Sequence, residues 1–111
     1  MAPKTIIIQG ESLGRGDETL GKILTANFLR VLGDSKEKPE AIILWNAGVR
    51  LACEGSEMLE HLKHLEQQGV KVLACTTCLE YYDLREKLVV GEPTTMVKSI
   101  AAMMSTETIT L

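Results

Sequence analysis

The sequence predicts a three-layer α/β sandwich built on a mainly parallel sheet, and two observations support this class. First, three short runs, residues 5–9, 41–46 and 71–75, are almost wholly apolar and rich in β-branched side chains, as in strands buried on both faces. Second, segments with helical spacing of apolar residues separate these runs. Strands that alternate with helices are joined by right-handed crossovers, which produce a parallel sheet with helices on its faces.

Composition is that of one globular domain, which we expect to span residues 1–111. The net charge of -3 provides no basic surface for nucleic acid. No apolar run approaches the roughly 18 residues that a membrane span needs, and the first residues have no signal-peptide pattern. We therefore expect a cytoplasmic protein without nucleic-acid or membrane partners.

The first predicted strand runs into a glycine-rich loop, Gly10–Asp17. Asp17 or Thr19 is expected to cap the helix that follows, which ends at Gly33. Gly14-Arg15-Gly16 begins like a dinucleotide-binding fingerprint, but Thr19 stands at the third glycine position, so nucleotide binding is not predicted. The apolar stripe of this helix consists of Leu20, Ile23, Leu24, Phe28, Val31 and Leu32.

The second predicted strand leads into a long loop, residues 47–55. Ser56 is expected to cap the next helix. After the third strand we expect a helical turn near Asp83 and a short strand at Val89–Val90.

The last helix is expected to be capped by Thr94 or Thr95 and to precede a closing strand, residues 108–111. Its long side chains recur at helical spacing and are typical of core or subunit contacts. They are Met96, Val97, Ile100, Met103 and Met104.

Two thiols, Cys75 and Cys78, stand where the third strand ends and a helix begins. In a parallel sheet the carboxyl ends of the strands face the crevice in which ligands bind. The thiolate is the reactive form, and helix N-termini and C-x-x-C pairs can lower the pKa of a cysteine. The pair therefore predicts sulfur or redox chemistry.

Cys53, Arg15 and Arg50 are candidate accessory residues, because their loops leave the same edge of the sheet as the two thiols. The arginines would stabilise anionic sulfur; in the simpler interpretation Arg50 reaches water along its aliphatic stem, Arg15 lies in a helix-entry turn and Cys53 fills space. No metal or cofactor is predicted, since no second C-x-x-C exists and His61 and His64 are expected on a solvated helix face.

Several separated motifs resemble those of a known family. They are Gly14-Arg15-Gly16-Asp17, Asn46-Ala47-Gly48-Val49, Glu54-Gly55-Ser56-Glu57, Cys75-Thr76-Thr77-Cys78-Leu79 and Val90-Gly91-Glu92. Their order over nearly the whole chain resembles the DsrE/DsrF-like family, and most closely the C-terminal domain of the YedF-type proteins named for selenium metabolism.

The resemblance implies a five-stranded, mainly parallel α/β/α domain that assembles into homo-oligomers and carries sulfur as a cysteine persulfide. It implies that Cys75 accepts the sulfur and that Cys78 is the second thiol. The partners would be sulfur-donor and sulfur-acceptor proteins, and no cofactor is implied. The resemblance leaves open whether the protein acts as a sulfurtransferase with enzymatic turnover, and whether its cargo is sulfur or selenium.

Two residues depart from the family pattern. Thr76 replaces the glycine usual between the paired cysteines, and Cys53 stands where threonine is expected. The small sulfur-carrier domain that precedes this one in longer relatives is absent from the sequence, so we expect a separate protein to deliver the sulfur.

Two other functions remain open from the sequence. A non-catalytic oligomeric interaction module would use the cysteines structurally, and its thiols would be buried and unreactive. A dithiol redox switch would form a reversible Cys75–Cys78 disulfide without a stable persulfide.

Overall fold

The computed structural model describes residues 2–111 and contains a five-stranded sheet in the order β4-β3-β2-β1-β5. All neighbouring strands are parallel. This confirms the fold class expected from the sequence. The strands are β1 (Lys4–Ile8), β2 (Ala41–Leu44), β3 (Lys71–Cys75), β4 (Glu92–Thr94) and β5 (Glu107–Thr110).

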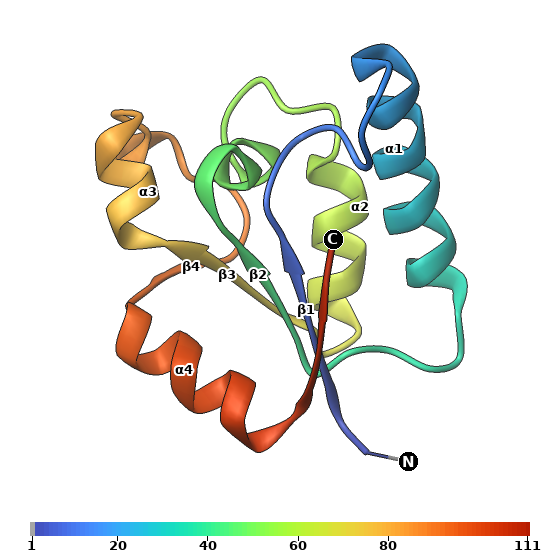
Figure 1. Cartoon of the computed structure of the whole chain (residues 1–111), viewed down its shortest axis with the longest axis vertical. Helices are drawn as coiled ribbons and strands as arrows, with labels where there is room; N and C mark the ends of the chain where they lie inside the picture. The colour runs from blue at the N-terminus through green and yellow to red at the C-terminus, as the bar shows by residue number, and fades with distance from the viewer. Residues whose placement is uncertain (1) are drawn as a thin grey trace.

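Helices cover both faces of the sheet (Figure 1). The helices α1 (Glu18–Asp34) and α2 (Leu59–Gln67) lie side by side on one face, and α4 (Met96–Ser105) crosses the other. The strand order explains this, because the chain steps from β1 to β4 in one direction and then returns across the sheet to β5. For right-handed crossovers, the returning helix must lie on the opposite face.

Three short elements lie at the carboxyl end of the sheet (Figure 1). They are the 3-10 helix η1 (Asn46–Ala52), the helix α3 (Thr76–Tyr81) and the 3-10 helix η2 (Arg85–Lys87). The segment after β2, expected to be a loop, is therefore largely helical.

The main core lies between the sheet and the α1–α2 pair. Alternate residues of the three central strands face it, because successive strand residues point to opposite faces. Burial of each large aliphatic side chain contributes about 1.5–3 kcal/mol. The core includes Ile6, Ile8, Ile42, Leu44 and Val72 from the strands and Leu29, Leu62 and Leu65 from the helices.

Helix α1 packs on this core mainly through Leu29 and small residues, and only Phe28 and Leu32 of its apolar stripe contact the core. Gly21, Thr25, Leu29 and Gly33 are buried. A Cβ added at Gly33 would lie 2.8 Å from the imidazole ring of His64, so α1 and α2 are too close for a larger side chain there. Most of the stripe therefore remains accessible, and the exposed fractions are 54% for Leu20, 54% for Ile23, 44% for Leu24 and 55% for Val31.

Two of the predicted helix caps are confirmed and one is wrong. Asp17 accepts a hydrogen bond from the backbone of α1 at 2.8 Å, and Thr95 does so for α4 at 3.2 Å. Ser56 does not cap α2, which begins at Leu59 without a side-chain cap. The Ser56 hydroxyl instead accepts from the backbone N–H of Met58, in the turn before the helix.

The strand predicted at Val89–Val90 is wrong, and the fourth strand begins at Glu92. The backbone N–H groups of Val89 and Val90 both donate to the carbonyl of Ala52, so this segment pairs with the end of η1 instead of β3. The helical turn expected near Asp83 is present as η2, although Asp83 itself has a left-handed φ of 57° and precedes it.

Candidate functional site

The dithiol stands at the carboxyl edge of the sheet, where Cys75 ends β3 and Cys78 lies in the first turn of α3. Cys75 is 6% exposed, whereas Cys78 is half-buried. Burial raises the pKa of the Cys78 thiol, and a hydrogen bond with the neighbouring Cys75 raises it further. The lowered pKa expected for a C-x-x-C thiol is therefore not found at Cys78.

One contact favours the ionised form of Cys78. The backbone N–H of Asn46 donates to its Sγ over 3.0 Å and opposes the rise in its pKa. Asn46 is the first residue of η1 and has a φ of 54°, in the left-handed region that residues other than glycine rarely adopt. Such backbone strain persists only where the surroundings hold it in place.

The surroundings of Asn46 form a chain of side-chain contacts. Its Oδ1 accepts a hydrogen bond from Oη of Tyr82. The Arg50 guanidinium lies over the Tyr82 ring, 4.4 Å from the centroid, and its Nη1 is 3.6 Å from a carboxylate oxygen of Glu11. The loop after β1, the helix η1 and the helix α3 are thus joined at one edge of the sheet.

Arg50 is therefore linked to the dithiol indirectly, through Tyr82 and Asn46. Among residues 2–111, the described partners of its guanidinium are the Glu11 carboxylate and the Tyr82 ring, and neither is a thiol.

Cys53 has contacts of its own, apart from the dithiol. Its thiol donates to the carbonyl of Val49 at 3.2 Å, and the residue is 1% exposed. Burial raises its pKa, with a further contribution from the adjacent Glu54 carboxylate. These are the features of a thiol that packs and hydrogen-bonds rather than reacts.

Arg15 is exposed in the loop between β1 and α1. Within the part of the chain that the structure describes, it takes part in no ion pair or side-chain hydrogen bond. The hydroxyl of Thr25 donates to the carbonyl of Glu11 at 2.9 Å and fixes this loop against α1. The loop thereby contributes Glu11, not Arg15, to the contacts around the thiols.

A glycine allows η1 to lie close to the sheet. At Gly48 an added Cβ would lie 2.3 Å from the carbonyl oxygen of Ile8, at the end of β1. Any larger residue would push η1 away from the strand end. The position of Asn46 and Arg50 thus depends on this close approach.

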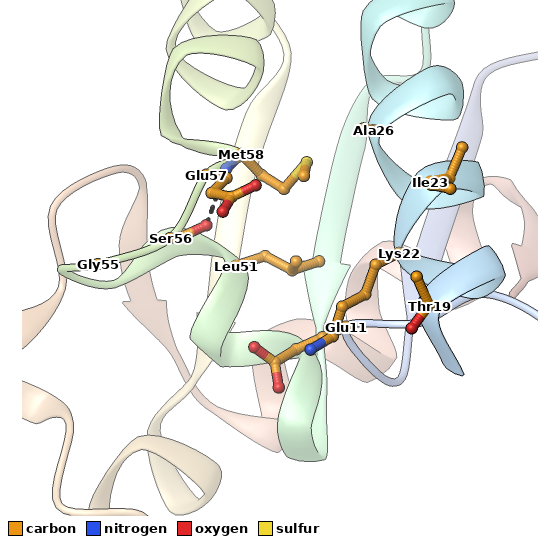
Figure 2. A pocket seen from close by; sticks show the side chains of 10 residues that line it. All are labelled: Glu11, Thr19, Lys22, Ile23, Ala26, Leu51, Gly55, Ser56, Glu57 and Met58. Atoms are coloured by element: carbon orange, nitrogen blue, oxygen red, sulfur yellow. Dashed lines mark hydrogen bonds between the residues drawn. The ribbon is translucent and has the colours of Figure 1, made fainter. Parts of the chain in front are cut away.

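A cavity of about 380 Å³ lies beside the site, between α1, η1 and the start of α2 (Figure 2). Leu51 and Met58 point into it from one side and Lys22 from the other. Glu11 lines it too and is the one described residue shared with the contact chain that leads to Cys78. Neither Cys75 nor Cys78 lines this cavity, so the dithiol lies outside it.

Residues 2–111 bring together no set of three histidine, cysteine, aspartate or glutamate side chains able to hold a metal ion. Over the same residues, no helix combines the length and apolarity required to cross a membrane.

Sequence reasoning singled out the thiols but not the contacts that position them. It placed Asn46 in a motif, and it did not identify Glu11. The one available signal was an asparagine directly after a buried strand, since asparagine tolerates left-handed backbone better than most residues.

Comparison with solved structures finds close counterparts of this architecture. The YchN protein from E. coli has a TM-score of 0.77 and 18% identity, with 100% of both chains covered. MTH1491 from Methanobacterium thermoautotrophicum, a protein of unknown function, has a TM-score of 0.71 and 19% identity over 100% of both chains. This chain has a DsrE-like fold. No protein-family model matches the sequence, and neither does any curated protein.

Proposed function

We propose that this protein is a sulfur carrier that takes up persulfide sulfur on Cys75 and passes it to an acceptor protein. The observation that supports this function best is the pair of free thiols at the carboxyl edge of the sheet. Cys78 is partly accessible, and its sulfur receives an N–H donor from Asn46. A site of this kind suits sulfur exchange better than hydrolysis, because the one carboxylate in the contact chain, Glu11, is paired with Arg50.

The transfer is redox-neutral. The Cys75 thiolate attacks the outer sulfur of a donor persulfide, the sulfur–sulfur bond of the donor breaks, and the donor leaves as a thiolate that takes the proton lost by Cys75. An acceptor thiolate removes the outer sulfur in the same way and restores the Cys75 thiol.

Cys78 provides a second route of release. Its thiolate attacks Sγ of the Cys75 persulfide, a Cys75–Cys78 disulfide forms, and hydrosulfide leaves. An external thiol reductant must then reduce the disulfide. The position of the two residues supports this step, because Cys75 ends β3 and Cys78 follows in the first turn of α3.

The test is sulfur loading followed by mass mapping. The reduced protein is incubated with a cysteine desulfurase and cysteine, and intact and peptide masses are measured. The expected result is one added sulfur on Cys75, absent in Cys75→Ser and retained in Cys53→Ser, which serves as the matched control. No uptake, with thiols that alkylate only after unfolding, would favour the structural interaction module instead.

A dithiol redox switch is the second candidate, and the same close pair of thiols favours it. It differs in one measurable respect, because a switch takes up no sulfur from the desulfurase and forms the Cys75–Cys78 disulfide only when an oxidant such as a small-molecule disulfide is added. Fragment masses of the two cysteines distinguish these products.

We infer a homo-oligomer from the apolar residues left exposed on both faces. On α4 the exposed fractions are 78% for Val97 and 82% for Met104, in addition to the stripe on α1. Contiguous exposed apolar side chains are typical of interaction surfaces. Light scattering of wild type, Leu24→Lys and Val97→Lys tests this: we expect an oligomer that at least one substitution dissociates, and a monomeric wild type would contradict it.

The carrier function requires donor and acceptor proteins in a compartment that keeps thiols reduced, which we take to be the cytoplasm. Because the sequence resembles YedF-type proteins, we further propose selenium as an alternative cargo. Loading with a selenium donor under matched conditions tests that assignment, and retention of sulfur alone would contradict it.

A further inference from the structure

Two buried polar atoms make no hydrogen bond to any other residue that the structure describes. They are the indole Nε1 of Trp45 and the hydroxyl oxygen of Thr94. Thr94 is only 3% exposed. Buried groups of this kind are rare in native proteins, because each loses its bonds to water and gains nothing in return.

These two residues flank Cys75 on the sheet. Thr94 is the register partner of Cys75 between β4 and β3. On the other side, Leu44 of β2 pairs with Ala74, and Trp45 continues the strand with an extended backbone of φ -118° and ψ 152°. Trp45 therefore stands opposite Cys75.

All three side chains lie on one face of the sheet. Residues directly opposite each other on neighbouring strands point the same way, and this face alternates along each strand. Thr94 is also tied to the dithiol helix, because the hydroxyl of Thr76 donates to its backbone carbonyl at 2.9 Å. The threonine that replaces the glycine expected between the cysteines thus helps to position Thr94.

We propose that Trp45 and Thr94 form a binding site for the outer sulfur of a Cys75 persulfide, to which each donates one hydrogen bond. The inference rests on the proposed carrier function. Neither group bonds to the sulfur of the resting thiol. A second sulfur would extend the Cys75 side chain by about 2 Å. The two donors therefore suit the outer sulfur of a persulfide rather than the Cys75 thiol itself.

The chemistry of the cargo explains why such donors are useful. A persulfide ionises more readily than a thiol, so the outer sulfur is anionic. A buried anion needs hydrogen-bond donors, and bonds to a charged acceptor are stronger than those between neutral groups. At 6% exposure Cys75 is shielded from stray thiols, and the loaded carrier satisfies two groups that the empty carrier leaves unpaired.

The test uses substitutions that remove each donor. Trp45→Phe keeps the aromatic packing, Thr94→Val keeps the shape, and Thr94→Ser keeps the hydroxyl as a matched control. Each protein is loaded by the desulfurase, freed of donor, and exposed to a fixed concentration of a small thiol. The loss of outer sulfur is followed by mass spectrometry, together with the thermal stability of the unloaded protein.

We expect Trp45→Phe and Thr94→Val to lose the sulfur about tenfold faster than wild type, as removal of a charge-assisted hydrogen bond predicts. Thr94→Ser should behave like wild type. Unloaded Thr94→Val should be as stable as wild type or more so, because an apolar isostere removes an unpaired buried group.

Three results would overturn the inference, and they are distinguishable. Equal sulfur lifetimes in wild type and both variants would contradict the proposed binding site but would not contradict the carrier function. Unloaded Thr94→Val that is clearly less stable than wild type would show that the Thr94 hydroxyl is structural. No sulfur uptake by wild type itself would reject the carrier function and this site together.

Discussion

The backbone N–H of Asn46 donates to the sulfur of Cys78 at 3.0 Å, across the gap between η1 and α3. It joins residues 32 positions apart in the sequence. A left-handed residue that follows a buried strand thus supplies the donor that faces the accessible thiol. The donor is held in place by Tyr82 and, through its ring, by Arg50.

Tyr82→Phe should make Cys78 less reactive without removing its packing. The ring stays under Arg50, but the hydroxyl that holds Asn46 is lost. The Asn46 N–H lowers the pKa of Cys78, so a loosened donor should raise this pKa and shift the pH profile of alkylation to higher pH. Alkylation rates are measured in a Cys75→Ser, Cys53→Ser background, so that Cys78 alone reacts.

Tyr81→Phe is the matched control for this substitution. Tyr81 is the neighbouring tyrosine and is 83% exposed. Its alkylation profile should coincide with that of the parent protein. Coincident profiles for all three proteins would show that Tyr82 does not position the donor.

Gly48→Ala should destabilise the fold and disturb the site. The new Cβ would lie 2.3 Å from the Ile8 carbonyl oxygen, which forces η1 away from β1. We expect a loss of about 2–4 kcal/mol in the free energy of unfolding, as for other overpacked positions. Urea denaturation measures it.

Gly10→Ala provides the comparison for this overpacking. Nothing lies within 4 Å of a Cβ at Gly10, so the change in stability should be small. A Gly48→Ala variant as stable as Gly10→Ala would contradict the close packing of η1 on the strand end.

Stability should fall as the pH rises through the range in which thiols ionise. Burial raises the pKa of Cys53 and of Cys78, so the folded protein holds these protons more tightly than the unfolded chain. This contribution is present below the pKa of an unfolded cysteine and is lost as the pH rises through the folded value.

The Cys53 share of this pH dependence is measurable. Serine does not titrate in this range, so Cys53→Ser should show a shallower alkaline decrease in the free energy of unfolding than wild type. Identical slopes in urea denaturation from neutral to alkaline pH would contradict a raised pKa at Cys53.

The sheet could be predicted from the sequence because the composition of its central strands is sufficient to identify them as buried strands. Runs such as Ile6-Ile7-Ile8 and Ile42-Ile43-Leu44 are stable only in a buried sheet, and their alternation with helices specifies parallel pairing. The edge strand β4 was misplaced because Glu92 and Pro93 have low strand propensity. Its pairing with β3 depends on the tertiary position of Thr94 beside Cys75.

The orientation of α1 on the core could not be predicted from the sequence either. Periodicity identified the helix and its apolar stripe, but not that close contact with α2 would bury the glycine side instead. Which stripe faces the core is decided by the distance between packed helices, and that distance is not visible in the periodicity of one helix.

The sequence predicted at which edge of the sheet the site residues lie, but not the contacts that they make there. Parallel pairing places Cys75, Cys53 and Arg50 at one edge of the sheet. Whether a thiol there meets a carbonyl, as Cys53 does, or an N–H group, as Cys78 does, depends on the backbone path of η1. The left-handed conformation of Asn46 sets that path, and its one signal in the sequence is an asparagine directly after a buried strand.

The most direct test of the carrier function follows one labelled sulfur atom. The protein is loaded from cysteine that carries isotopically labelled sulfur, separated from the donor, and cleaved for fragment mass spectrometry. The account predicts one labelled sulfur per chain, bound to Cys75, that moves to an added acceptor thiol. Labelled sulfur that never binds Cys75, either in wild type or in a Cys78→Ser variant that cannot form the disulfide, would contradict it.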